Sequence, residues 1–136
     1  MNYIIDTHIF LWSIVAPKKV SRKVKTILLD PHNTIQISCL TFWEIALKYQ
    51  LGKLSLKNIT PDSLPAIAQE SGFKILNLDP ETASSFYKLP KKKNKDPFDR
   101  MLVWQAIQKD LILITKDKHL ADYKSEGLQI VWCAPP

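Results

Sequence analysis

Short apolar runs alternate along this chain with longer segments in which apolar side chains recur at helical spacing. Runs of the first kind are typical of strands buried in a parallel sheet, and segments of the second kind of helices packed on it. The expected strands are 3–5, 34–38, 74–78, 111–114 and, at an edge, 129–132. The expected helices are 8–15, 21–29, 41–51, 61–71, one that opens at Asp79, 96–109 and a turn at 118–123. This alternation predicts one α/β domain over residues 1–136, an α/β/α sandwich around a mostly parallel sheet.

Helix starts are marked by polar residues at capping positions. Asp79 and Asp96 each precede a proline, which indicates an N-cap followed by proline at the first helical position. Thr41 and Glu44 have capping-box spacing, and Gly52 stands where a helix beginning at Thr41 is expected to end.

Four carboxylates stand where an apolar run has just ended or a helix has just begun. They are Asp6, Glu44, Asp99 and Asp117. Such junctions in a parallel sheet open onto one rim, so acids far apart in sequence can converge there. Oxygen ligands without paired histidines or cysteines favour Mg²⁺ or Mn²⁺, and such an ion can activate water for attack on a phosphoryl group.

Each of these acids alone also has a purely structural explanation, because acids routinely cap helices or favour their first turn. The joint pattern argues for more. Asp96 already caps its helix, which leaves Asp99 unexplained, and Glu44 lies among apolar neighbours where an unpaired charge is unfavourable. A shared metal ion accounts for all four.

Charge indicates the class of ligand. Lys plus Arg number 19 and Asp plus Glu 13, a net charge of +6. A basic surface around an acidic pocket suits nucleic acid, although a merely soluble basic protein has the same balance. Lys91, Lys92, Lys93 and Lys95 adjoin Asp96 and are candidate RNA contacts; a solvated loop is the alternative.

The chain has no apolar run of the length that a membrane span needs, and Met1–Asp6 does not resemble a secretory signal. Cys39 and Cys133 form no metal-binding pair and are expected to be reduced thiols. A cytoplasmic protein is therefore expected, with no membrane contact.

Four segments together resemble the PIN-domain ribonucleases, and most closely the VapC-like toxins of bacterial type II toxin–antitoxin modules. The segments are Ile4-Ile5-Asp6-Thr7, Trp43-Glu44-Ile45-Ala46-Leu47-Lys48 with Gly52-Lys53-Leu54, Asp96-Pro97-Phe98-Asp99-Arg100, and Ile114-Thr115-Lys116-Asp117. They stand in the family's order and span nearly the whole chain.

The resemblance implies an endoribonuclease that depends on Mg²⁺ or Mn²⁺, forms homodimers and is inhibited by a small cognate antitoxin. It maps the metal ligands and catalytic acids onto Asp6, Glu44, Asp99 and Asp117. Asp96 is then an additional acid near the site, and Thr115 a supporting hydroxyl. Arg100 is expected to pair with a neighbouring acid, with phosphate contact as the alternative.

One position departs from the family pattern. Relatives often carry a histidine two residues before the first Asp of the Asp96–Arg100 motif, and this chain has Asn94. His8 and His119 each follow a predicted ligand by two residues and are expected to be structural, because a metal-bound water needs no histidine base.

Two other functions are open at this level. A catalytically idle PIN-like module could bind RNA or protein, but a decayed site is expected to lose one of its acids. Another Mg²⁺-dependent phosphohydrolase is the second alternative. Asp6-Thr7-His8 lacks the second aspartate of a phosphoaspartate-forming motif, which argues against one major version.

Overall fold

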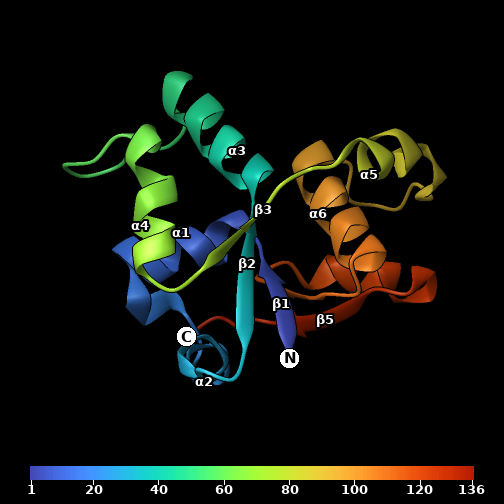
Figure 1. The fold of residues 1–136 in the computed structure, drawn as a ribbon, viewed down its shortest axis with the longest axis horizontal. Coiled ribbons are helices and arrows are strands. Elements are labelled where there is room, and N and C mark those ends of the chain that lie inside the picture. The colour runs from blue at the N-terminus through green and yellow to red at the C-terminus, as the bar shows by residue number, and fades with distance from the viewer.

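A five-stranded sheet in which every strand is parallel lies at the centre of the computed structural model, which describes residues 1–136 (Figure 1). The strands are β1 Asn2–Ile5, β2 Thr34–Ser38, β3 Lys74–Leu76, β4 Ile112–Thr115 and β5 Gln129–Trp132. The α-helices are α1 Thr7–Val15, α2 Arg22–Leu29, α3 Cys39–Gln50, α4 Leu64–Glu70, α5 Pro80–Ser85 and α6 Pro97–Gln108. The 3₁₀ segments are η1 Pro17–Lys19, η2 Pro61–Ser63, η3 Phe86–Lys88 and η4 Lys118–Glu126. The α/β fold class expected from the sequence is confirmed.

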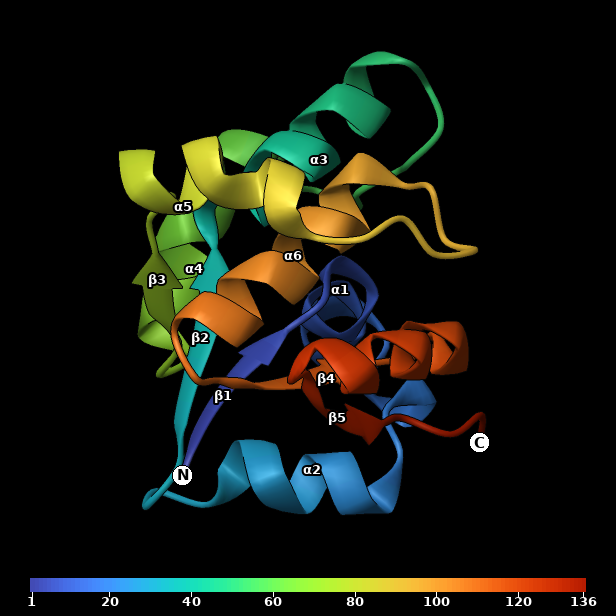
Figure 2. The same cartoon turned by 90° about the vertical axis from the view of Figure 1, so that its right-hand side faces the viewer.

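The sheet separates two apolar layers because alternate strand side chains point to opposite faces. Tyr3 and Ile5 of β1 join a buried cluster with α1, α2 and α4, whereas Ile4 between them joins a second cluster with α6 and η4. Figures 1 and 2 show α1 and α4 on one side of the sheet and α6 on the other. The molecule is thus the three-layer sandwich predicted from the strand–helix alternation.

Several expected elements differ from those observed by a residue or two, and the helix expected over 61–71 is divided into η2 and α4. Two of the differences have a clear local cause. β3 is shorter than the predicted 74–78 and ends at Leu76, because Asp79 and Pro80 open α5 soon afterwards. α3 begins at Cys39, two residues earlier than predicted, because the Ser38 hydroxyl caps it by accepting from the Leu40 amide at 3.2 Å. The expected capping box between Thr41 and Glu44 is therefore wrong. None of the helices is long and apolar enough to cross a membrane.

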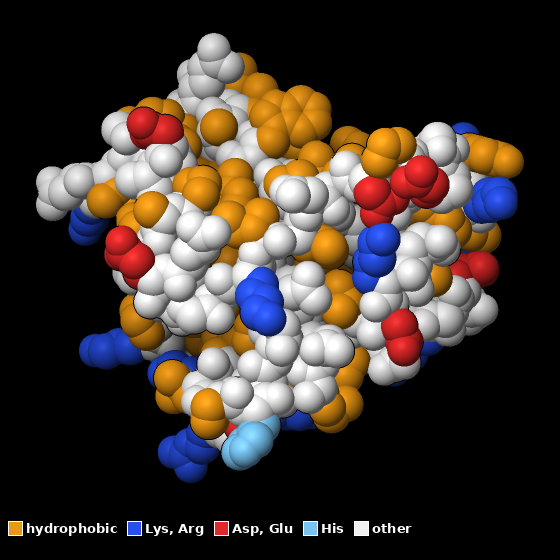
Figure 3. Space-filling model, in the orientation of Figure 1, with side chains coloured by type: hydrophobic (Ala, Val, Ile, Leu, Met, Phe, Trp, Pro, Cys, Tyr) orange, Lys and Arg blue, Asp and Glu red, His pale blue; other side chains and the backbone are white.

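Hydrophobic side chains are also exposed beside the end of the sheet. Trp43 of α3 is 60% exposed and meets Phe98 of α6 edge to face, with ring centroids 5.3 Å apart. The two residues help line an apolar pocket of about 260 Å³ between α3, α6 and η3. Figure 3 shows hydrophobic side chains gathered over this face around α3. The start of α6 is thereby braced against α3.

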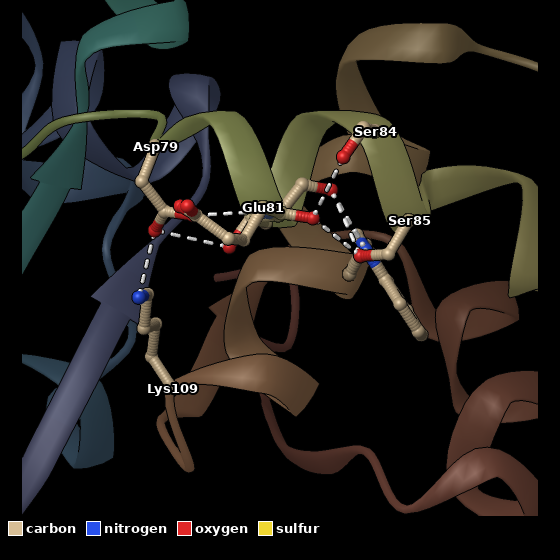
Figure 4. A network of polar contacts seen from close by, with 7 residues as sticks. Asp79, Glu81, Ser84, Ser85 and Lys109 are labelled. Carbon is tan, nitrogen blue, oxygen red and sulfur yellow. Dashed lines mark hydrogen bonds and ion pairs between the residues drawn. The ribbon is translucent and has the colours of Figure 1, made fainter.

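A polar network fastens α5 to the end of α6 (Figure 4). Asp79 caps α5 by accepting from the Thr82 amide at 2.7 Å, and its other oxygen lies 2.7 Å from the Lys109 ammonium. The indole nitrogen of Trp104 in α6 donates to the Thr82 carbonyl at 3.0 Å. The bond from Lys109 and those from Thr82 hold the pKa of the Asp79 carboxyl well below its usual range.

We predict that Asp79→Ala lowers the melting temperature, because it removes both the helix cap and the ion pair. A depressed pKa stabilises the fold above the ordinary pKa of 3.8 and loses that effect as the pH falls. The difference from wild type should therefore be largest near neutral pH and shrink below pH 4. Thermal unfolding from pH 3 to 8 tests this. Asp122→Asn is the control, because the Asp122 side chain makes no hydrogen bond or ion pair.

Candidate active site at the carboxyl ends of β1 and β4

The strand order places the candidate site. Strands run β3-β2-β1-β4-β5, so the chain order reverses between β1 and β4. Ligands of open parallel sheets bind in the crevice beyond the strand ends at such a switch point. Asp6 directly follows β1, Thr115 ends β4, and Asp117 lies two residues further on. Because Ile5 pairs with Ile114 in the sheet register, the residues that follow these two strands emerge side by side.

Asp6 is almost fully enclosed at the rim and is only 4% exposed. One carboxylate oxygen caps α1 by accepting from the Ile9 amide at 2.8 Å. The other accepts from the Thr115 hydroxyl at 2.6 Å and from the Lys116 amide at 3.2 Å. Burial raises the pKa of Asp6 although these bonds oppose the shift. Asp6 is thus the N-cap of α1, and the same side chain also joins β1 to the end of β4.

Asn94 joins the two acids on the other side of the crevice. Its amide nitrogen donates to Asp99 at 3.0 Å and to Asp117 at 3.1 Å. Its amide oxygen accepts from the backbone of Asp96 at 2.8 Å, which orients the group. Asp96 itself caps α6, as predicted, by accepting from the Phe98 amide. The residue that departs from the family pattern thus lies between two of the predicted ligands.

Glu44 reaches the rim from α3 and is 2% exposed. One of its carboxylate oxygens accepts from the Thr7 hydroxyl at 2.5 Å, and the other lies 2.5 Å from the Lys48 ammonium. Thr7 follows Asp6 in the chain, so this bond brings Glu44 next to the β1 end. Although partial burial opposes it, the bond and ion pair to Glu44 raise the pKa of Lys48.

Between these elements lies a polar cavity of about 420 Å³ with no hydrophobic residue in its lining. It is lined by Asp6, His8, Asp99, Lys116 and Asp117. Burial, together with the charges of Asp96, Asp6 and Glu44, raises the pKa of Asp99 to about 6 despite the bond from Asn94. Concentrated negative charge is therefore the dominant electrostatic feature of this cavity.

A basic cavity of about 370 Å³ lies beside the acidic one. Asn94 connects them, because it lines the basic cavity and donates to Asp99 and Asp117 of the acidic cavity. The lining of the basic cavity is Lys91, Lys92, Asn94, Lys95 and Arg100. Lys92 lies 3.5 Å from Glu126, and Lys93 is exposed outside the lining. The predicted basic loop therefore borders the cluster of acids.

Arg100 does not pair with an acid, so that expectation is wrong. Its guanidinium donates to the Leu89 carbonyl at 3.1 Å and to the Tyr123 hydroxyl at 3.3 Å. It also lies over the ring of Phe86, 4.8 Å from the centroid. These contacts anchor the start of the basic loop to α6 and η4, because Leu89 is the last buried residue before the lysines.

Comparison with known proteins agrees with this geometry. Residues 3–126 match the family model of the PIN domain. The chain belongs to the PIN domain family. Ribonuclease VapC22 of Mycobacterium tuberculosis is 21% identical over 129 residues, which cover 95% of this chain and 97% of that protein. The PIN family expected from the four motifs is thus confirmed.

Solved structures of VapBC proteins have the same fold. VapBC2 from Rickettsia felis, bound to a DNA fragment from its promoter, superposes with a TM-score of 0.68 at 20% identity, covering 98% of this chain and 99% of that one. VapBC-1 from nontypeable Haemophilus influenzae gives a TM-score of 0.63 at 17% identity, covering 97% and 98%. At these identities the likeness establishes a shared fold.

Three neighbours of the acids were not among the predicted site residues of this PIN domain. Lys48 lies one helical turn after Glu44, a spacing that favours an ion pair and could have revealed it. His8, expected to be structural, and Lys116 both line the acidic cavity. No sequence pattern predicts that His8 and Lys116 line the cavity, because their positions depend on β1 and β4 ending side by side.

The donor set suits a hard divalent cation, since it consists of carboxylate oxygens with no cysteine. No group of three or more His, Cys, Asp or Glu side chains is arranged to hold a metal ion as it stands. The Asn94 amide occupies the space between Asp99 and Asp117, and Lys48 occupies one oxygen of Glu44. Asp99 keeps one oxygen without a hydrogen bond.

We predict that Asp99→Asn makes the metal-free PIN domain more stable at pH 7.5. Between pH 3.8 and about 6, the Asp99 carboxyl is protonated in the folded protein but ionised in the unfolded chain. The free energy of unfolding therefore falls as the pH rises through this range, and the loss is complete at pH 7.5. Removing the charge should restore on the order of 1 kcal/mol after allowance for solvent screening. Thermal unfolding in EDTA, with Asp122→Asn as control, measures this. A variant less stable than wild type would contradict the electrostatic origin of the shift.

Proposed function

We propose that this PIN domain is a metal-dependent endoribonuclease and the toxin of a toxin–antitoxin pair. The observation that carries the proposal is the polar cavity at the switch point. Asp6, Asp99 and Asp117 line this cavity, and none of the three forms an ion pair with a Lys, Arg or His side chain. Membership of the PIN family and the relative named Ribonuclease VapC22 support RNA as the substrate.

Asp6, Asp99 and Asp117 would hold a Mg²⁺ or Mn²⁺ ion, with Glu44 beside them through Thr7. Their fit to such an ion follows from the donor chemistry and from the raised pKa values of Asp6 and Asp99. A divalent cation offsets the cost of burying these two charges and, at Asp99, the repulsion from neighbouring acids as well. When bound, it supplies an activated water and stabilises negative charge on the phosphoryl group.

The residues of the chain provide position and charge for this reaction. Bonds from Thr115 and from the Ile9 amide hold Asp6 in one orientation, and Asn94 holds Asp99 and Asp117 side by side. Water attacks phosphorus, a new phosphorus–oxygen bond forms, and the bond to the leaving ribose oxygen breaks. The attacking water gives up one proton, and the leaving ribose oxygen takes one up.

RNA phosphates on one side of the cut bond would enter the basic cavity. Lys91 and Lys95 line it and form no ion pair, whereas Lys92 already faces Glu126. Phosphate contacts supply most of the affinity for nucleic acid without reading sequence. These two lysines are therefore the strongest candidates for contacts to the RNA backbone.

The proposed partners follow from the relatives. Structures of VapBC toxin–antitoxin systems share the fold, so a small cognate antitoxin is the expected inhibitor of this chain. A homodimer is also proposed, on the family resemblance. Co-expression with the protein encoded by the adjacent gene, followed by size-exclusion chromatography with light scattering, tests both assemblies.

We predict that purified protein cleaves RNA with Mg²⁺ or Mn²⁺ and not with EDTA. Asp99→Asn should lower the rate by more than about 100-fold, because even outer-shell partners of metal ligands contribute about 10–100-fold. Cleavage of a mixed RNA pool, followed by sequencing of the new ends, measures this. Since the same variant is expected to be more stable, its loss of activity cannot be attributed to unfolding.

Metal-independent cutting that persists in Asp99→Asn would contradict the proposal and indicate a contaminating nuclease. RNA binding without cleavage, by protein supplied with metal and freed of antitoxin, would favour the binding module considered from the sequence. Hydrolysis of a small phosphate monoester but not of RNA would favour the alternative phosphohydrolase.

A second prediction concerns the basic cavity. Lys91→Gln with Lys95→Gln should weaken RNA binding and make the binding constant less dependent on salt, with a slope lower by about 0.7 for each phosphate that is no longer neutralised. Fluorescence anisotropy at several salt concentrations, in the Asp99→Asn background to prevent cutting, measures this. Lys18→Gln with Lys23→Gln removes equal charge from exposed positions in η1 and α2, and it should leave the slope nearly unchanged.

A further inference from the structure

Glu44 differs from the other three acids in its electrostatic partner. The ammonium of Lys48 lies 2.5 Å from one of its oxygens, and the Thr7 hydroxyl donates to the other. The Glu44 side chain is 3% exposed and that of Lys48 33%, so the pair is largely shielded from water. A charge pair in such a setting is screened much less than one on an open surface.

Neutral donors alone hold the remaining acids. Asp6 accepts from the Thr115 hydroxyl and from backbone amides, and Asp99 and Asp117 share the Asn94 amide. No nitrogen of Lys, Arg or His lies within ion-pair distance of these three carboxylates. A neutral hydrogen bond leaves the negative charge and further lone pairs of a carboxylate in place. Their charge is therefore still available to a cation.

The lining of the polar cavity also separates Glu44 from the other three acids. Asp6, Asp99 and Asp117 line the polar cavity, and Glu44 does not. The three lining carboxylates carry a charge of −3 and the lining ammonium of Lys116 carries +1, so a single divalent ion neutralises the lining. A second ion would need the charge of Glu44, which Lys48 already neutralises.

We infer that Lys48 is a built-in counter-cation that withholds Glu44 from metal and limits this site to one divalent ion. The inference rests on the proposed metal-dependent function and assigns Lys48 as a positioning residue within it. Lys48 occupies the Glu44 oxygen that a second ion would require. Glu44 then contributes through its bond to Thr7, next to Asp6, and does not coordinate metal.

Mn²⁺ binding tests the inference without reference to activity. Isothermal titration of the antitoxin-free protein, with free Mn²⁺ counted by electron paramagnetic resonance, gives both stoichiometry and affinity. Wild type should bind one ion per chain. Lys48→Met should bind a second ion, or bind the first at least about tenfold more tightly, because a positive charge next to the site has been removed.

Three further variants separate charge from structure. Lys48→Arg keeps the cation and should behave as wild type. Lys53→Met removes a lysine from an exposed position just beyond α3 and should also behave as wild type. Glu44→Gln combined with Lys48→Met leaves no unpaired buried charge, so it remains informative if Lys48→Met alone fails to fold. It should bind one ion.

Two ions on the wild-type protein would overturn the inference, as would Lys48→Met binding Mn²⁺ like Lys53→Met. Either result is compatible with metal-dependent RNA cleavage, which would leave the proposed function standing. A wild-type protein that neither binds Mn²⁺ nor cleaves RNA would refute the proposed function and this inference with it.

Discussion

Buried negative charge at the end of β1 is the constraint around which this rim of the molecule is organised. Asp6 leaves an apolar strand and is almost fully enclosed, so its carboxylate must find donors within the protein. It finds them on α1 and at the end of β4. The same bonds that satisfy Asp6 thereby fix where Thr115 and Asp117 emerge. The fold brings the acids together, and the acids in turn bind the ends of two adjacent strands.

Negative charge beyond this structural need is what favours a function for the site. Asp99 contributes to no helix cap, and its raised pKa shows that its ionised form is disfavoured in the metal-free protein. A group that opposes folding is a poor structural device, but it suits a site that binds cations. Stability and metal binding therefore make opposite demands on the same carboxylate. The basic loop beside it has the opposite charge, with Lys91 and Lys95 lining a second cavity without an ion pair.

Much of this architecture could be predicted from the sequence because its signals are local. The buried runs at 3–5 and 111–114, and the cap and proline at Asp96 and Pro97, each determine an element without help from distant residues. The acids at the rim could be named because parallel strands that alternate with helices open on one side. Family membership follows from motifs of the same local kind.

The errors concern contacts made across the fold. Glu44 has the spacing of a capping box, but a serine earlier in the chain starts the helix and frees Glu44 to bond Thr7 and Lys48. Arg100 stands beside acids in the sequence and yet points to Leu89, Tyr123 and Phe86. In both cases local spacing suggested one partner, and packing between distant segments brought the side chain to others.

We propose Asp6, Asp99 and Asp117 as the cation site, with Glu44 still paired with Lys48. Anomalous scattering from crystals of the protein grown with Mn²⁺ tests it most directly. The expected result is one manganese peak within coordinating distance of those three carboxylates, with the Lys48 ammonium still on Glu44. A manganese ion coordinated by Glu44 with Lys48 displaced, or no peak at the three aspartates, would contradict it.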